Sequence, residues 1–168
     1  DNTFLHGKFA EKKQWDFGVD VVTRMGFDWK CGRQDKAIHP FTTGFGIGDI
    51  RITTRFDEHY VGSALFSTMH EGGHAMYEQG IGRNLSGLPI ATGASMAIHE
   101  SQSRMWENLV GRSLSFWKFY YPRLRKAFPQ QLGNVDLHTF YRGINRVQPS
   151  LVRVEADEAT YNLHIMLR

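Results

Sequence analysis

Apolar residues recur at steps of three and four around positions 58–79, and this spacing predicts a partly buried helix. The apolar positions are Leu65, Phe66, Met69, Ala75, Met76 and Tyr77. Two histidines, His70 and His74, interrupt this apolar stripe instead of lying opposite it. At about 100° per residue they lie roughly 40° apart around the helix axis, one turn above the other. The helix is therefore expected to present both imidazoles to one place.

The remaining pattern predicts helices with one short strand. Helices are expected over residues 8–25, about 95–120, 135–147 and onward from near 154, with Gly26, Pro122 and Pro149 as the ends of the first three. Isoleucines alternate with polar residues in "DIRITTRF", residues 49–56, which predicts a strand. The glycine-rich segments 26–49 and 80–93 are expected to be loops. The predicted fold class is mainly α with one small β element.

Composition excludes several classes of protein. The 168 residues are 41% hydrophobic and 22% charged, as expected of one globular domain. A net charge of +3 without a block of like charge gives no nucleic-acid partner, and no apolar run has the length of a membrane span. Cys31 is the only cysteine, so a cytoplasmic setting is expected. Because the chain starts at Asp1 and stops inside an amphipathic run, we interpret it as a segment of a longer protein.

The predicted helix over residues 58–79 carries residues that are typical of a metal site. In "HEGGH" Glu71 follows His70, and His74 completes the H-E-x-x-H arrangement of zinc-dependent proteases. Two imidazoles at this spacing reach one zinc ion at about 2.0–2.1 Å, and the glutamate stays free to take a proton from water. Gly72 and Gly73 cost about 1 kcal/mol each relative to alanine, which makes sense if another backbone or a substrate approaches closely. The alternative is a solvated helix face that carries two histidines.

A catalytic zinc also needs a third protein ligand and an open position for water. Glu100 lies 26 residues after His74, far enough for a loop and a returning helix. Together with His70 and His74, Glu100 would form a His₂Glu ligand set. His99 is the competing ligand, but on a helix it points about 100° away from Glu100, so the two are not expected to serve together. A surface ion pair between Glu100 and Arg104 is the alternative, and these residues alone leave the choice open.

With these residues in view, the chain resembles the Taq-type metallocarboxypeptidases, thermostable enzymes of the gluzincin group. The resemblance extends over essentially all 168 residues. Five blocks carry it, in family order: "HPF" at 39–41, "DIRIT" at 49–53, "HEGGH" at 70–74, "HESQS" at 99–103 and "VRVEADEATY" at 152–161. It implies a zincin-like helical core with the β element beside the active site, and a chain that is the single catalytic segment, residues 1–168, of a longer homodimeric enzyme.

The resemblance also implies roles for individual residues. His70, His74 and Glu100 become ligands of one divalent metal, with zinc expected first and cobalt or manganese as alternatives. Glu71 becomes the general base, and Arg153 a substrate-binding residue of a narrow groove. The "HPF" and "DIRIT" blocks become groove walls.

A carboxypeptidase must recognise a free C-terminal carboxylate, which a planar guanidinium binds best. Arg51, Arg55 and Arg153 are the candidates, and Arg153 has acidic neighbours that can hold it in place. His39 can line the groove or be an ordinary loop histidine. The expected substrates are peptides with a free C-terminus. The alternatives are an endopeptidase or aminopeptidase of the gluzincin group, or a non-catalytic segment with a structural metal.

Overall fold

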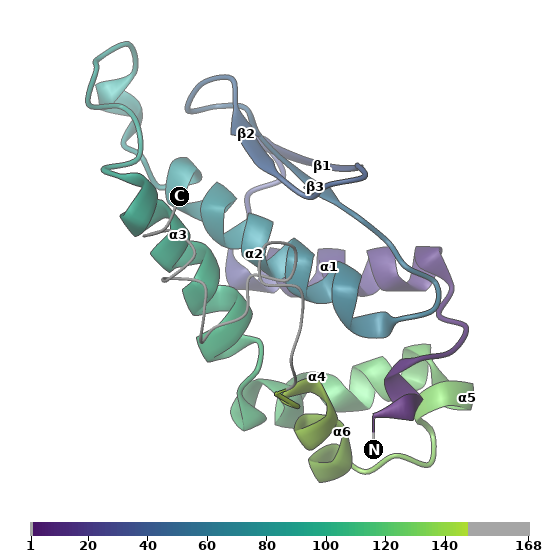
Figure 1. Ribbon diagram of the computed structural model, residues 1–168. Helices are drawn as coiled ribbons and strands as arrows, with labels where there is room; N and C mark the ends of the chain where they lie inside the picture. Colours follow the sequence, from purple (N-terminus) through teal and green to yellow (C-terminus); the bar gives the residue numbers. More distant parts are fainter. Residues whose placement is uncertain (1, 148–168) are drawn as a thin grey trace.

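One long helix, α2 (Val61–Gln79), is the centre of the fold in the computed structural model, which describes residues 2–147. It contacts α1 (Glu11–Met25), α3 (Met96–Arg104) and strand β3 (Ile50–Thr54), while α4 to α6 gather at the end away from the sheet (Figure 1). The other elements are η1 (Thr3–Leu5), β1 (Gly32–Lys36), β2 (Thr42–Gly44), η2 (Arg83–Leu85), a π-helical turn (Met105–Val110), α4 (Leu114–Ala127), α5 (Pro129–Leu132) and α6 (Leu137–Ile144). No helix within residues 2–147 combines the length and apolarity that crossing a membrane requires.

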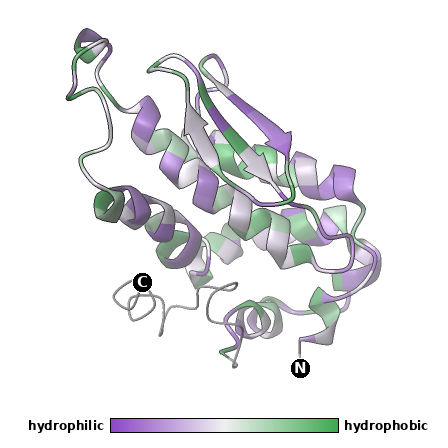
Figure 2. Cartoon of the chain, turned by 45° about the horizontal axis from the view of Figure 1, so that its top comes forward, coloured by the Kyte–Doolittle hydropathy of each residue, from purple (hydrophilic) through white to green (hydrophobic). Residues whose placement is uncertain are grey.

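Two groups of buried apolar side chains hold these elements together. The larger lies between α1, α2 and α4 to α6 and contains the fully buried Trp117 and Phe9. The smaller joins the sheet to α1 and α2 through Val22, Phe27, Ile50, Ile52 and Ala75. Green apolar residues in Figure 2 accordingly gather where helices and sheet face one another. Both groups include side chains of α2, so the position of its histidines is determined by the core. The mainly α fold class with one small β element is confirmed.

The sheet has the order β1-β3-β2, with β3 parallel to β1 and antiparallel to β2. The predicted strand in 49–56 is confirmed as β3, but the prediction of a loop over 26–49 was wrong, because β1 and β2 lie in it. β1 carries no apolar residue, so alternation could not reveal it. It forms because its backbone pairs with β3, and its one buried side chain, Gln34, donates to the hydroxyl of Thr54 at 2.8 Å.

The helix predictions were confirmed in part. α1 ends at Gly26 as predicted, with a φ of 119° that favours glycine. The single helix expected over 95–120 was wrong: α3 and the π turn end before a new helix, α4, which Ser113 caps by accepting from the Phe116 amide at 3.1 Å. Pro122 also does not end a helix. It lies inside α4, where the missing hydrogen bond is offset by the packing of four buried side chains: Trp117, Tyr120, Tyr121 and Leu124. The helix expected from residue 154 lies outside the described residues, and α6 falls within the one expected over 135–147.

Candidate metal centre

The site begins with a close approach of two helices at a glycine. A Cβ atom on Gly73 would lie 2.7 Å from the Cα of Ser103 and 2.9 Å from the backbone oxygen of Gln102. α3 can therefore pack on α2 at this distance only because position 73 has no side chain. The expectation that another backbone approaches the glycine pair is confirmed at Gly73. The approach places the first turns of α3 beside the histidines of α2.

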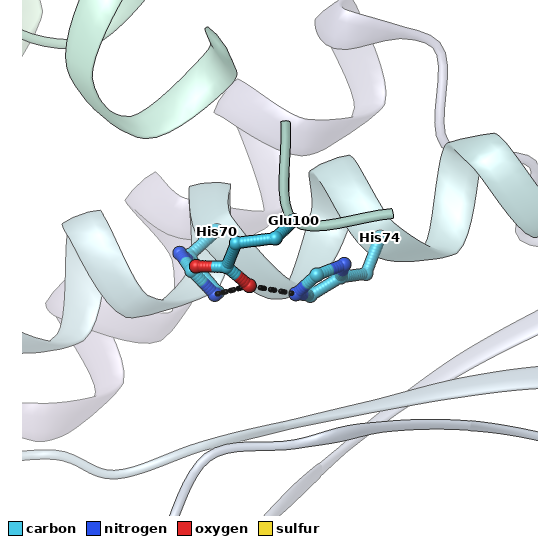
Figure 3. A group of neighbouring side chains, drawn as sticks. All are labelled: His70, His74 and Glu100. Atoms are coloured by element: carbon cyan, nitrogen blue, oxygen red, sulfur yellow. Dashed lines mark ion pairs between the residues drawn. The ribbon is translucent and has the colours of Figure 1, made fainter. Parts of the chain in front are cut away.

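His70, His74 and Glu100 come together where the two helices meet. Their nitrogen and oxygen atoms lie within 4.8 Å of one another. The Glu100 Oε2 atom lies 3.9 Å from His70 Nε2 and 3.4 Å from His74 Nε2, between the two rings (Figure 3). All three side chains are largely buried, with 13–25% exposed.

This donor set fits a divalent ion. Tetrahedral zinc with bonds of about 2.0–2.1 Å places its ligand atoms roughly 3.3 Å apart. The His74–Glu100 separation of 3.4 Å matches that spacing, and the His70–Glu100 separation of 3.9 Å exceeds it by about 0.6 Å. Two imidazole nitrogens with one carboxylate oxygen form the three-ligand set that catalytic zinc sites use, with one position left for water.

The charge state of Glu100 suits a ligand. Burial raises the pKa of its carboxyl group, but the hydrogen bond with His74 and the charges of His70, His74 and Arg104 outweigh burial and bring the pKa to about 2. Its second oxygen accepts from the Arg104 Nε atom at 3.1 Å. The sequence leaves an ion pair with Arg104 and a contact with the histidines as alternatives for Glu100, and in the structure the carboxylate makes both at once.

The π turn supplies a partner for His70. The Glu107 Oε2 atom lies 2.9 Å from His70 Nδ1, and Arg104 and Arg112 lie within 3.5 Å and 3.9 Å of the same carboxylate. Burial raises the pKa of Glu107, but its hydrogen bond with His70 and these positive charges outweigh that effect and lower the pKa. For His70, burial lowers the pKa, but the bond to Glu107 and the charges of Glu107, Glu71 and Glu100 outweigh it and raise the pKa. An ionised Glu107 that accepts from Nδ1 would leave Nε2 of a neutral His70 available to bind a metal ion.

His99 contacts the cluster from behind His74. Its Nδ1 atom lies 2.6 Å from His74 Nδ1, and its Nε2 atom lies 2.7 Å from Glu78 Oε1. It is therefore turned toward the side of His74 that faces away from Glu100. This agrees with the expectation that His99 and Glu100 do not act as ligands together.

Glu71 stays outside the ligand cluster. Its side chain is buried and its Oε2 atom lies 2.7 Å from the Thr42 hydroxyl of β2, which is also 3.0 Å from the Glu71 backbone oxygen. The sheet thus lies against the residue that the H-E-x-x-H spacing singled out. The Glu71 carboxylate is therefore held by Thr42 and is not one of the three clustered donors.

Arg51 and His39, two of the predicted substrate-binding residues, do not belong to this cluster. Arg51 is paired through two hydrogen bonds with Asp49, at 2.8 and 2.7 Å, and its guanidinium lies 4.8 Å from the centre of the Phe45 ring. Strand alternation places it on the opposite face of β3 from Ile50 and Ile52, which pack toward α2. His39 is exposed in the connection between β1 and β2.

The two predicted groove-wall blocks are described by the structure, whereas the predicted arginine of the last block is not. The "HPF" and "DIRIT" blocks meet, since the Phe41 amide donates to the Thr53 hydroxyl at 3.0 Å and the Thr53 amide donates to the Phe41 carbonyl at 2.9 Å. Arg153 lies outside the described residues. Glu78, Glu107 and Thr42 contact the site but are not among the predicted site residues. Two of them had a signal: Glu78 lies four residues after His74, and Glu107 lies seven residues after Glu100, in each case on the same face of a predicted helix.

Comparisons with known proteins agree on one family. The family model described as carboxypeptidase Taq (M32) metallopeptidase matches residues 1–168. Thermostable carboxypeptidase 1 of Thermus thermophilus is 48% identical over 168 residues, which are 100% of this chain and 33% of that protein. Carboxypeptidase 1 of Bacillus subtilis is 46% identical, over 100% of this chain and 34% of that protein. The crystal structure of the M32 carboxypeptidase from Deinococcus radiodurans R1 superposes with a TM-score of 0.94 at 49% identity, over 99% of this chain and 33% of that one. The chain thus spans about a third of the length of these relatives.

Proposed function

The chain belongs to the carboxypeptidase Taq (M32) metallopeptidase family, and from this premise we propose that the protein is a metal-dependent carboxypeptidase that hydrolyses the C-terminal peptide bond of peptides. The observation that carries the proposal is the cluster of His70, His74 and Glu100 with the buried carboxylate of Glu71 beside it. The chain would be the catalytic segment of this enzyme. The homodimer and the cytoplasmic location stay predictions from the resemblance and the composition.

The residues divide the chemistry between binding and proton transfer. His70, His74 and Glu100 would hold the divalent ion, and the bound ion supplies Lewis-acid activation of a water molecule and of the scissile carbonyl. Glu71 accepts the proton of the attacking water and passes it to the leaving amine, so it acts first as base and then as acid. The Thr42 hydroxyl, within hydrogen-bond distance of the Glu71 carboxylate, fixes the direction of that carboxylate. Zinc is proposed first for this donor set, ahead of cobalt and manganese.

The C-terminal carboxylate of the substrate is proposed to be recognised by an arginine. We propose Arg153 as the residue that binds the free carboxylate, because Arg51 is already paired with Asp49. His39, exposed before the edge strand β2, is proposed to contact the substrate farther from the scissile bond.

Two matched peptides test this function, one with a free C-terminus and one amidated, incubated with the full-length protein. We expect free amino acid to be released from the free-ended peptide when divalent metal is added, and no release in the presence of chelator. The amidated peptide should resist, because it lacks the carboxylate that a guanidinium binds. Cleavage of both peptides would indicate an endopeptidase instead. An absence of release from either peptide, with metal bound, would contradict the proposal.

A further inference from the structure

Behind the metal ligand His74 lies a chain of two further groups. His74 and Glu78 lie one turn apart on α2, and His99 from α3 lies between their polar atoms. The two Nδ1 atoms of the histidines are 2.6 Å apart, and His99 Nε2 is 2.7 Å from Glu78 Oε1. The three side chains are 13–22% exposed, so water has limited access to these bonds.

The direction of the hydrogen bonds follows from which atoms can donate. A carboxylate only accepts, so His99 Nε2 carries the proton that points at Glu78. In neutral His99 the Nδ1 atom is then an acceptor, and the proton between the rings belongs to His74 Nδ1. Neutral His74 would then present the lone pair of its Nε2 atom to a metal ion, whereas in protonated His74 the Nε2 atom donates to the Glu100 carboxylate, which lies 3.4 Å away. In the opposite tautomers a lone pair of His99 would face the Glu78 carboxylate, and a proton on His74 Nε2 would occupy the direction of the metal.

The loop before α3 encloses this chain of bonds. A Cβ atom on Gly93 would lie 2.9 Å from His99 Cδ2, so the loop backbone lies directly against the His99 ring. The Tyr77 ring meets His99 edge to face, with the ring centres 5.1 Å apart, and the Tyr77 hydroxyl accepts from the Ala94 amide at 3.0 Å. His99 is thereby held in one orientation by packing as well as by hydrogen bonds.

We propose that Glu78 and His99 are positioning residues, which fix the tautomer and the ring direction of His74 for metal binding. The inference rests on the proposed metal centre. It differs from the situation at His70, where the carboxylate of Glu107 contacts the ligand directly. At His74 the negative charge acts through a second imidazole, so Glu78 has an effect on the metal only while His99 is present.

The test measures metal affinity in three variants of the full-length protein, Glu78→Gln, His99→Phe and the double variant, by competition for zinc with a chromophoric chelator. Loss of an outer-shell partner weakens metal binding by about 10–100-fold, and we expect a loss in this range for each single variant. Because Glu78 acts through His99, the double variant should bind zinc no more weakly than His99→Phe alone. The visible spectrum of the cobalt-loaded variants should also differ from that of the wild type, since the His74 ring is no longer fixed.

Asp16→Asn is the matched control, because it removes one carboxylate charge from an exposed ion pair with Lys12 on α1. An affinity of Glu78→Gln equal to that of Asp16→Asn would overturn the proposal, and so would additive losses in the double variant. Circular dichroism of each variant reports whether folding is kept. A wild-type protein that binds zinc but releases no amino acid would contradict the proposed function alone, whereas a wild type that binds none of zinc, cobalt and manganese would overturn both.

Discussion

Glu71→Gln is expected to keep the bound metal and to lower kcat by about three orders of magnitude, within the range that a positioned general base contributes. Glu71 lies outside the three-residue donor cluster, so an amide in its place removes no ligand. The amide is nearly the same size and can still bond with the Thr42 hydroxyl, which lies 2.7 Å from the present carboxylate. What it cannot do is accept a proton from water. The loss should therefore appear in turnover and leave metal content unchanged.

The measurement is kcat on a free-ended peptide, with the metal content of the same samples determined in parallel. His70→Ala is the contrasting variant, because it removes one of the three donors and should lose metal and activity together. A Glu71→Gln enzyme that turns over at a rate near that of the wild type would show that the base is another group. A variant without metal would show that Glu71 is needed to hold the ion.

Local spacing predicted one half of the site and not the other. The four-residue step between His70 and His74 fixes their relative direction on any α-helix, so their convergence could be read from the sequence. The position of Glu100 depends on how α3 docks on α2, which is a property of packing between helices. Its two possible partners, Arg104 and the histidines, could therefore be named but not ranked. The blocks of the family resemblance supplied the choice, because they carry information about the whole fold.

The errors in the predicted fold have the same origin, because they too depend on contacts between elements. β1 consists of polar residues and glycine, and only its pairing with β3 makes it a strand. Pro122 is a strong local signal for a helix end, yet the buried aromatic side chains of α4 outweigh it. Thr42 lies on β2, which the glycine-rich pattern of residues 26–49 predicts to be loop, so its contact with Glu71 is not predictable from the sequence. Thr42 and His99 are contributed by segments whose approach to α2 no local pattern encodes, whereas Glu78 lies on α2 itself.

Gly73→Ala is expected to separate α3 from α2 and to weaken both metal binding and turnover. The new Cβ atom would lie 2.7 Å from the Ser103 Cα atom, whereas carbon atoms pack at about 3.5–4.0 Å, so the helices must part by roughly 1 Å. The obstructing atoms belong to the backbone of α3 and cannot rotate away. Glu100, three residues before Ser103, would move away from the histidines with its helix. A displacement of this size lowers turnover by about 100-fold.

Gly72→Ala is the matched control for this prediction, because it makes the same substitution at the neighbouring position of the same helix. Its Cβ atom would lie 3.1 Å from Val22 Cγ1, a side-chain methyl group that can shift by a few tenths of an ångström. Alanine also favours the helix over glycine by about 1 kcal/mol at either position, so helix propensity does not separate the two variants. We expect Gly72→Ala to keep zinc affinity and turnover close to the wild type, with both measured beside Gly73→Ala. Equal losses in the two variants would mean that the glycine pair matters for a reason other than the contact with α3. Full zinc affinity in Gly73→Ala would mean that the position of Glu100 does not depend on that contact.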